Sequence, residues 1–161
     1  MADVCVVNAS PLIFLGAAGR LEFLRLIAPR VLVPLSVLGE VGAHGPNDPA
    51  SIAAGAATWL DRRTPPPPPA SVLSWDLGAG ESAVIALALQ HPGAVAILDD
   101  LQARRCAESL GIPVAGTLGI VLLARKAGIL PAAKPFLEEL RTKGMWLSDR
   151  VLNAVLKEFG E

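Results

Sequence analysis

The sequence has few cysteines and histidines, and none of them forms a recognisable motif. Cys5 and Cys106 are the only cysteines among 161 residues, and they form no C-x-x-C pair. Each lies in an apolar stretch, so the sequence predicts neither a disulfide framework nor a zinc site. His44 and His91 also lack the spacing of a metal-binding histidine motif. We therefore interpret all four as structural residues.

Several other absences exclude whole classes of protein. The sequence has no P-loop, no G-x-G-x-x-G fingerprint and no G-x-S-x-G elbow. This excludes P-loop NTPases, dinucleotide enzymes and typical hydrolases. No apolar run approaches the ~18 residues of a membrane span, and the N-terminus has no basic segment followed by a long apolar core. We therefore expect a soluble, cytoplasmic protein.

The charge of the chain is almost balanced. It has 14 Lys and Arg against 15 Asp and Glu, which gives a net charge of −1. This balance argues against a protein that binds nucleic acid by neutralising many phosphates, so any such binding must be local or use a bound cation. With 52% hydrophobic residues, 161 residues are enough for one domain with a real core.

Short apolar runs alternate with helical patterns along the chain. Ser10 is a good helix N-cap, and Pro11 suits the first helical position after it. This alternation predicts a three-layer α/β/α fold with a central parallel sheet. The predicted strands are 4–7, 31–33, 72–75, 94–98 and 112–115, and the predicted helices are 11–19, 20–28, 34–41, 47–63, 80–90, 101–110, 117–127, 132–143 and 148–159.

Five consecutive prolines, residues 65–69, interrupt the pattern. They suit neither a helix nor a central strand and predict an extended connection. Neither side of them has enough elements for a stable core of its own. We therefore expect residues 1–161 to form one domain with a proline-rich surface connection, although the segment could instead bind a partner domain.

Six polar residues follow predicted strands or begin predicted helices. In parallel α/β sheets, ligands bind beyond the carboxyl ends of the strands. Carboxylate and carbonyl oxygens there could hold Mg²⁺ or Mn²⁺, which lowers the pKa of a bound water and neutralises phosphate charge. The candidates are Asn8, Ser10, Glu40, Glu81, Asp99 and Asp100.

Each of these residues also has a purely structural interpretation. Glu81 could complement a helix dipole, and either Asp99 or Asp100 could cap the helix that follows. Glu40 could be a solvated helix residue, and Asn8 a turn residue. Only their occurrence together, at matching ends of elements, favours a functional site.

Several segments, in this order, resemble PIN domains, the fold of many small metal-dependent ribonucleases and bacterial toxin ribonucleases. Their order and spacing are more specific than any one of them, and together they cover nearly the whole chain. The segments are VVNASPLI (6–13), VPLSVLGEV (33–41), LGAGESAVIALAL (77–89), AILDDLQARRCAESLGIPVAGTLGIVLLARKAG (96–128) and GMWLSDRVLNAVLKEFGE (144–161).

The resemblance implies roles for particular residues. Glu40, Glu81 and one of the Asp99–Asp100 pair match the catalytic acids that hold Mg²⁺ or Mn²⁺. Asp100 falls further past the strand end, which favours it as the metal ligand. Ser10 and Thr117 match polar positions that line the substrate site.

Asn8 departs from the family pattern, because most active members of the wider family have Asp at this position. Asn keeps a carbonyl oxygen for a metal but removes one negative charge. Since divalent-metal affinity depends on the charge of the ligands, we expect weaker metal binding.

The resemblance predicts a metal-dependent ribonuclease, and the toxin of a toxin–antitoxin pair whose antitoxin covers the site. The alternative is a weakly active or non-catalytic module that binds RNA or a protein. A phosphoryl-accepting receiver domain is disfavoured, because the acid pair comes late and strand 112–115 carries no Lys.

A homodimer is also expected by resemblance, and its interface could involve the apolar residues near the C-terminus. The same residues could instead cover the core. They are Phe136, Leu137, Leu140, Trp146, Val151, Leu152, Val155 and Leu156.

Overall fold

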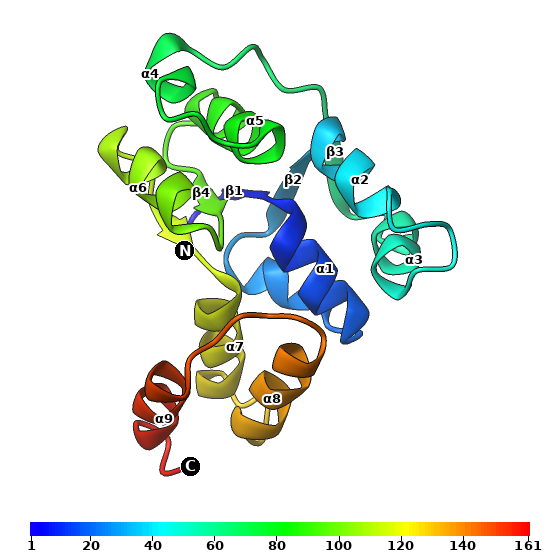
Figure 1. Cartoon of the computed structure of the whole chain (residues 1–161), viewed down its shortest axis with the longest axis vertical. Helices are drawn as coiled ribbons and strands as arrows, with labels where there is room; N and C mark the ends of the chain where they lie inside the picture. Colours follow the sequence, from blue (N-terminus) through cyan, green and yellow to red (C-terminus); the bar gives the residue numbers. More distant parts are fainter.

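The computed structural model describes all 161 residues and contains one five-stranded sheet whose strands are all parallel (Figure 1). The strand order is β3-β2-β1-β4-β5, so the first strand lies at the centre. Helices flank the sheet, which confirms the predicted three-layer α/β/α architecture. The strands are β1 (Val4–Val7), β2 (Arg30–Pro34), β3 (Leu60–Arg63), β4 (Val95–Ile97) and β5 (Val114–Ala115).

In Figure 1, α4 and α5 lie above the sheet and α1, α7, α8 and α9 lie below it, while α6 lies to the left of β4 and α2 and α3 lie at the right. No helix is both long and apolar enough to cross a membrane. The helices are α1 (Ala9–Ala17), the 3₁₀ helix η1 (Leu21–Leu26), α2 (Leu35–Gly42), α3 (Pro49–Ala56), α4 (Ala70–Leu73), α5 (Ala79–Leu89), α6 (Leu101–Ser109), α7 (Thr117–Lys126), α8 (Lys134–Thr142) and α9 (Asp149–Lys157).

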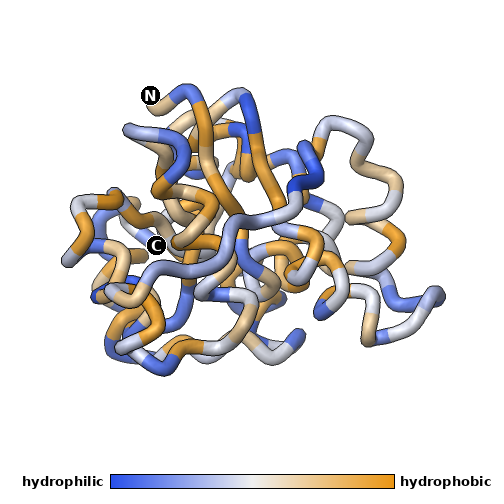
Figure 2. Tube along the Cα trace, turned by 90° about the horizontal axis from the view of Figure 1, so that it is seen from above, coloured by the Kyte–Doolittle hydropathy of each residue, from blue (hydrophilic) through white to orange (hydrophobic).

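A single hydrophobic cluster of 42 buried residues joins the sheet to both helical layers. Cys5, Val6 and Val7 of the central strand are completely buried. Strands covered on both faces are apolar throughout, which is why VCVV and VAI are continuous apolar runs. Figure 2 shows hydrophobic stretches of the chain running through the interior, with most hydrophilic stretches at the outer turns.

Two of the predicted elements are wrong. The predicted strand at residues 72–75 is instead the short helix α4 and the turn after it, with Val72 buried and Leu73 exposed. The predicted helix at 47–63 ends at Ala56, and the chain then forms β3. Parallel pairing with β2 stabilises β3, and this pairing is a long-range interaction that a helical pattern in the local sequence does not reveal.

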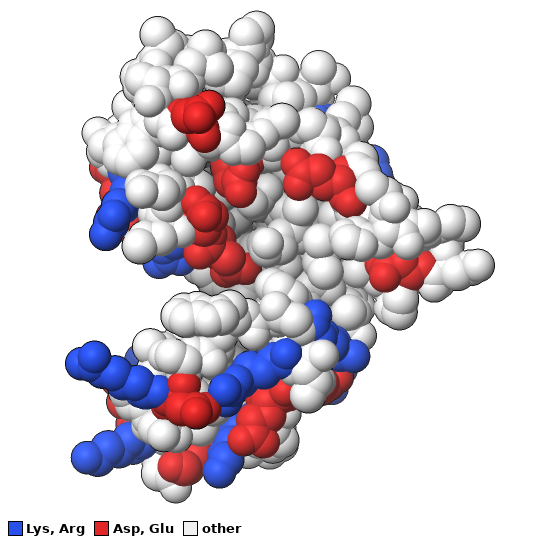
Figure 3. Space-filling model, in the orientation of Figure 1, with Lys and Arg blue, Asp and Glu red and all other residues white.

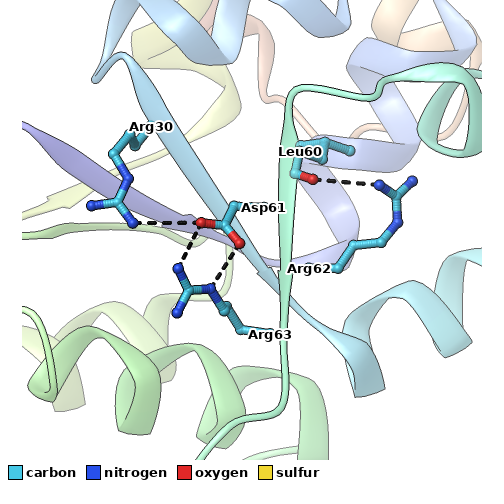
Figure 4. A network of polar contacts seen from close by, with 5 residues as sticks. All are labelled: Arg30, Leu60, Asp61, Arg62 and Arg63. Atoms are coloured by element: carbon cyan, nitrogen blue, oxygen red, sulfur yellow. Dashed lines mark hydrogen bonds and ion pairs between the residues drawn. The ribbon is translucent and has the colours of Figure 1, made fainter.

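Charged side chains along β3 mark it as an edge strand (Figure 4). Arg63 donates two hydrogen bonds to the Asp61 carboxylate, at 2.7 and 2.9 Å, and Arg30 of β2 donates a third at 3.5 Å. The pKa of Asp61 is lowered below its usual range, mainly because of the hydrogen bonds from Arg63. Arg62 donates to the Leu60 carbonyl at 3.4 Å.

The proline-rich segment connects β3 to α4 without regular secondary structure, as expected. Figure 1 shows it as a long extended connection at the top right of the fold. A pocket of about 580 Å³ lies beside it, and its lining contains none of the candidate site residues.

Most of the apolar residues near the C-terminus cover the core. Phe136, Leu137, Leu140, Leu152 and Leu156 are buried within the main cluster. Val155 packs against that cluster, whereas Trp146 and Val151 remain exposed. These helices therefore complete the fold, and only two of the eight side chains are free to contact a partner.

The last residue fastens the C-terminal segment to α7 and α8. The Glu161 carboxylate accepts hydrogen bonds from the backbone N–H groups of Ala133 and Lys134, both at 3.0 Å, and pairs with Arg125 at 3.2 Å. The backbone hydrogen bonds are the largest cause of the lowered pKa of this carboxyl.

Candidate active site

The topology places the ends of β1 and β4 side by side. The Asn8 backbone N–H donates to the Ile97 carbonyl at 3.1 Å, immediately beyond the paired strands. Asp99 follows Ile97 by two residues, so Asn8 and Asp99 lie at the same carboxyl edge of the sheet. Ligands of parallel α/β sheets bind at this edge.

Asn8 occupies the N-cap position of α1, where Ser10 was predicted. Ser10 is instead the second residue of the helix and is half-buried. Asn8 is only 5% exposed, and its side chain makes no capping hydrogen bond. Its Oδ1 is the one buried side-chain polar atom without a hydrogen-bond partner. Because an unpartnered buried oxygen is costly, this atom requires a water or a bound ion as the partner that the protein residues do not supply.

Gly80, in the first turn of α5, makes room for Glu40 of α2 beside Asn8. A Cβ atom at Gly80 would collide with Glu40 Oε1 and would lie 3.1 Å from Asn8 Oδ1. Gly78 does the same for Glu81, because a Cβ atom there would collide with Glu81 Oε2. Sequence reasoning missed both glycines, although the run LGAGE contains them.

The Glu40 and Glu81 carboxylates lie close enough to repel each other. The pKa of Glu40 is raised, first because its carboxyl is partly desolvated and second because of the negative charge of Glu81. A backbone hydrogen bond from Gly80 opposes this shift. Two mutually repelling carboxylates beside an unpartnered carbonyl oxygen form a set of oxygen donors suited to a cation.

Asp99 is held by Thr117, the first residue of α7. The Thr117 backbone N–H and hydroxyl each donate to the Asp99 carboxylate at 2.7 Å. Thr117 is fully buried and Asp99 is half-buried, so the carboxylate is fixed in direction. The resemblance implied that Thr117 lines the site, without indicating its partner.

Asp100 is exposed and caps α6, where it accepts a hydrogen bond from the Ala103 backbone N–H at 2.9 Å. Arg104 of the same helix donates to the Leu98 carbonyl at 3.0 Å. A Cβ atom at Gly116 would lie 2.6 Å from Arg104 Nη1 and 3.1 Å from Asp99 Oδ1. Gly116 therefore allows Arg104 and Asp99 to approach each other, and neither Gly116 nor Arg104 was predicted.

The structure thus brings Glu40 beside Asn8 at Gly80, with Glu81 close enough to raise the pKa of Glu40, and it places Asp99 against Thr117. No three or more His, Cys, Asp or Glu side chains converge in an arrangement that could hold a metal ion. Acidic side chains gather on the upper half of one face, above a hollow (Figure 3).

A family model described as "PIN domain" matches residues 4–161, nearly the whole chain. The chain belongs to the PIN-domain family. PIN domains are generally nucleases and typically use divalent metals. The resemblance of the five sequence segments is therefore confirmed. No curated protein matches this chain.

In this PIN domain, the residues present fit a divalent cation that takes few protein ligands. Mg²⁺ usually keeps several waters and binds through one or two carboxylates plus substrate phosphate. Glu40, Glu81 and the unpartnered Asn8 Oδ1 supply such a set. The space left by Gly80 keeps this set open, because a larger residue there would displace the Glu40 carboxylate.

Proposed function

We propose that this PIN domain is a Mg²⁺- or Mn²⁺-dependent ribonuclease that hydrolyses RNA phosphodiesters. One observation supports the proposal most strongly: the buried Oδ1 of Asn8 has no partner and lies beside the space that receives Glu40. A cation there would complete the coordination of this oxygen and relieve the repulsion between Glu40 and Glu81.

In this proposal Glu40, Glu81 and Asn8 hold the cation. When bound, the cation supplies a Lewis acid that neutralises phosphate charge and lowers the pKa of a water. The protein residues orient the phosphodiester at the sheet edge. Ser10, in the first turn of α1, is proposed by resemblance to line the substrate site.

We assign the third acid of the site, after Glu40 and Glu81, to Asp99. Asp100 had been favoured because it lies further past the strand end. Thr117 donates two hydrogen bonds to Asp99, and metal-binding carboxylates are typically oriented by such partners. The capping hydrogen bond to Ala103 gives Asp100 a structural role. Separate Asp99→Asn and Asp100→Asn variants test this assignment.

The test of the proposal is cleavage of a 5′-labelled single-stranded RNA by purified protein with Mn²⁺. The wild type should cut, and EDTA should stop the reaction. Glu40→Gln, Glu81→Gln and Asp99→Asn should each lose most of the activity. Glu158→Gln is the matched control, because Glu158 is an exposed carboxylate just beyond the end of α9 and should leave the rate unchanged. Cleavage that survives the double change Asp99→Ala and Asp100→Ala would come from a contaminant and would refute the assignment.

We further propose that the nuclease is the toxin of a toxin–antitoxin pair. A protein antitoxin would cover the acidic edge, by which we mean the carboxyl edge of the sheet with Glu40, Glu81 and Asp99. The expected result is growth arrest on induced expression, and no arrest for Glu40→Gln at equal protein level. The neighbouring reading frame should encode a small DNA-binding protein that restores growth when it is co-expressed. A homodimer remains a prediction that sedimentation of the purified protein tests.

A second candidate function is a non-catalytic PIN module that binds RNA or a protein. Asn8 favours it, because the neutral amide leaves the cation site one charge short of an aspartate. The two functions differ in whether the wild-type chain binds a divalent cation.

A further inference from the structure

Trp146 has an unusual position for so large an apolar side chain. It is 86% exposed, whereas Trp59 and Trp75 are partly buried against the core. A buried tryptophan removes roughly 150–250 Å² from water, so exposing one forfeits a large hydrophobic stabilisation. An exposed indole of this size is available to contact a ligand or a partner.

The loop that carries Trp146 is firmly held. We call residues 143–148, between α8 and α9, the Trp146 loop. Met145 packs against the core and Leu147 is buried, so the two neighbours of Trp146 anchor the chain on either side. Gly144 turns the chain with a φ of 100°, and the Met145 N–H donates to the Leu140 carbonyl at 3.0 Å.

The two ends of the loop are also fastened to each other. Arg141 of α8 forms an ion pair with Asp149 of α9 at 2.8 Å, and the Ser148 side chain caps α9 by accepting from the Val151 N–H. Trp146 is therefore presented outward by an ordered backbone.

The surroundings of the loop carry charges of both signs, and two of the cations there, Lys143 and Arg150, lack a close ion pair. Lys143 has only a weak ion pair with Glu139, at 3.9 Å, and Arg150 is exposed and has no ion pair. In Figure 1 the loop crosses the molecule just below the sheet. Figure 3 shows Lys and Arg side chains over the lower helices, on the same face as the acidic group and across the hollow from it.

We propose that Trp146 is a stacking platform for a base of single-stranded RNA, with Lys143 and Arg150 binding the adjacent phosphates. This inference rests on the proposed ribonuclease function, because it assigns the RNA strand a path from the acidic edge across the hollow to the loop. An aromatic ring flanked by cations is the arrangement by which proteins bind single strands without reading their sequence. A protein partner could also bury the indole, but the flanking cations Lys143 and Arg150 favour a polyanion.

The experiment measures binding of a fluorescein-labelled single-stranded 12-nucleotide RNA by anisotropy, in EDTA so that no cleavage occurs. Trp146→Ala should raise Kd by about 5- to 150-fold, which is the range for losing one base stack. Trp146→Phe keeps a π-face and should lose much less. Ile129→Ala removes another exposed apolar side chain, in the turn after α7, and should leave Kd unchanged. Changing Lys143 and Arg150 together to alanine should reduce the slope of log Kd against log salt by about 0.7 for each phosphate that is no longer neutralised.

The outcomes separate this inference from the proposed function. RNA binding that depends on Trp146, with no cleavage when Mn²⁺ is added, supports the platform and refutes the nuclease. Cleavage by the wild type with an unchanged Kd for Trp146→Ala overturns the platform alone. An unchanged Kd together with conversion of a dimer to a monomer on light scattering also overturns it, because Trp146 would then contact a second copy. A wild type that binds no RNA overturns both.

Discussion

Replacing Gly80 with alanine should separate the stability of the fold from the integrity of the site. The added Cβ would collide with Glu40 Oε1 and lie 3.1 Å from Asn8 Oδ1 and from Glu40 Cδ. The Glu40 side chain is long and exposed, so it can move away at little energetic cost. We therefore expect the Gly80→Ala chain to fold, with its Glu40 carboxylate displaced from Asn8.

The size of each effect follows from the structure. Alanine stabilises a helix by about 1 kcal/mol over glycine, and this gain offsets the steric cost, so the free energy of unfolding should change by no more than about 1 kcal/mol. Displacing a group that orients a metal site typically lowers metal affinity or activity by about 10- to 100-fold. Mn²⁺-dependent RNA cleavage should fall by at least this factor.

Gly55→Ala is the matched control, because Gly55 lies in α3 and a Cβ atom there would meet nothing within 4 Å. It should gain about 1 kcal/mol in urea unfolding, or about 3 °C in Tm, and keep the full cleavage rate. If Gly80→Ala instead cuts RNA as fast as Gly55→Ala does, the position of Glu40 beside Asn8 is irrelevant to catalysis.

Three further predictions concern the carboxylates. Glu40→Gln should stabilise the metal-free protein at pH 7.5 by less than about 1 kcal/mol. Folding raises the pKa of the Glu40 carboxyl, so its contribution to stability is present below the unfolded pKa and is lost as pH rises through the folded pKa. A neutral glutamine does not suffer this loss. Thermal unfolding in EDTA checks this, and a gain that persists at pH 3 would contradict it. Thr117→Val should cost about 2 kcal/mol in urea unfolding, since the Asp99 carboxylate loses a buried hydroxyl donor, and Thr117→Ser should restore most of it; equal losses in both variants would contradict this. Glu161→Ala should cost about 1 kcal/mol by removing the acceptor at the start of α8, and an unchanged Tm would show that this cap is unimportant.

The central strands and the edge they form could be predicted from the sequence. VCVV and VAI are continuous apolar runs because both faces of the sheet are covered, and each is followed by polar residues. The general rule for parallel sheets then placed Asn8 and Asp99 at one edge, and the structure does so. Such local patterns, together with topology, were sufficient for the architecture.

The elements that failed depend on contacts that are distant in sequence. β3 has the sequence LDRR, which is too polar to predict a strand, and it is stabilised by pairing with β2 and by the Arg30–Asp61 ion pair. The environment of the site was hidden for the same reason. Gly80 is significant only because Glu40 approaches it from another helix. Asp99 accepts a hydrogen bond from Thr117, which lies eighteen residues further along the chain.

The proposed cation site depends on Asn8, Glu40 and Glu81 binding a metal even though residue 8 is neutral. Calorimetric titration of the metal-free protein with Mn²⁺ tests this, with Glu40→Gln and Asn8→Asp titrated alongside. We expect one Mn²⁺ per wild-type chain, weaker or absent binding for Glu40→Gln, and tighter binding for Asn8→Asp. A wild type that binds no Mn²⁺, beside an Asn8→Asp variant that does, would show instead that the site has lost its metal.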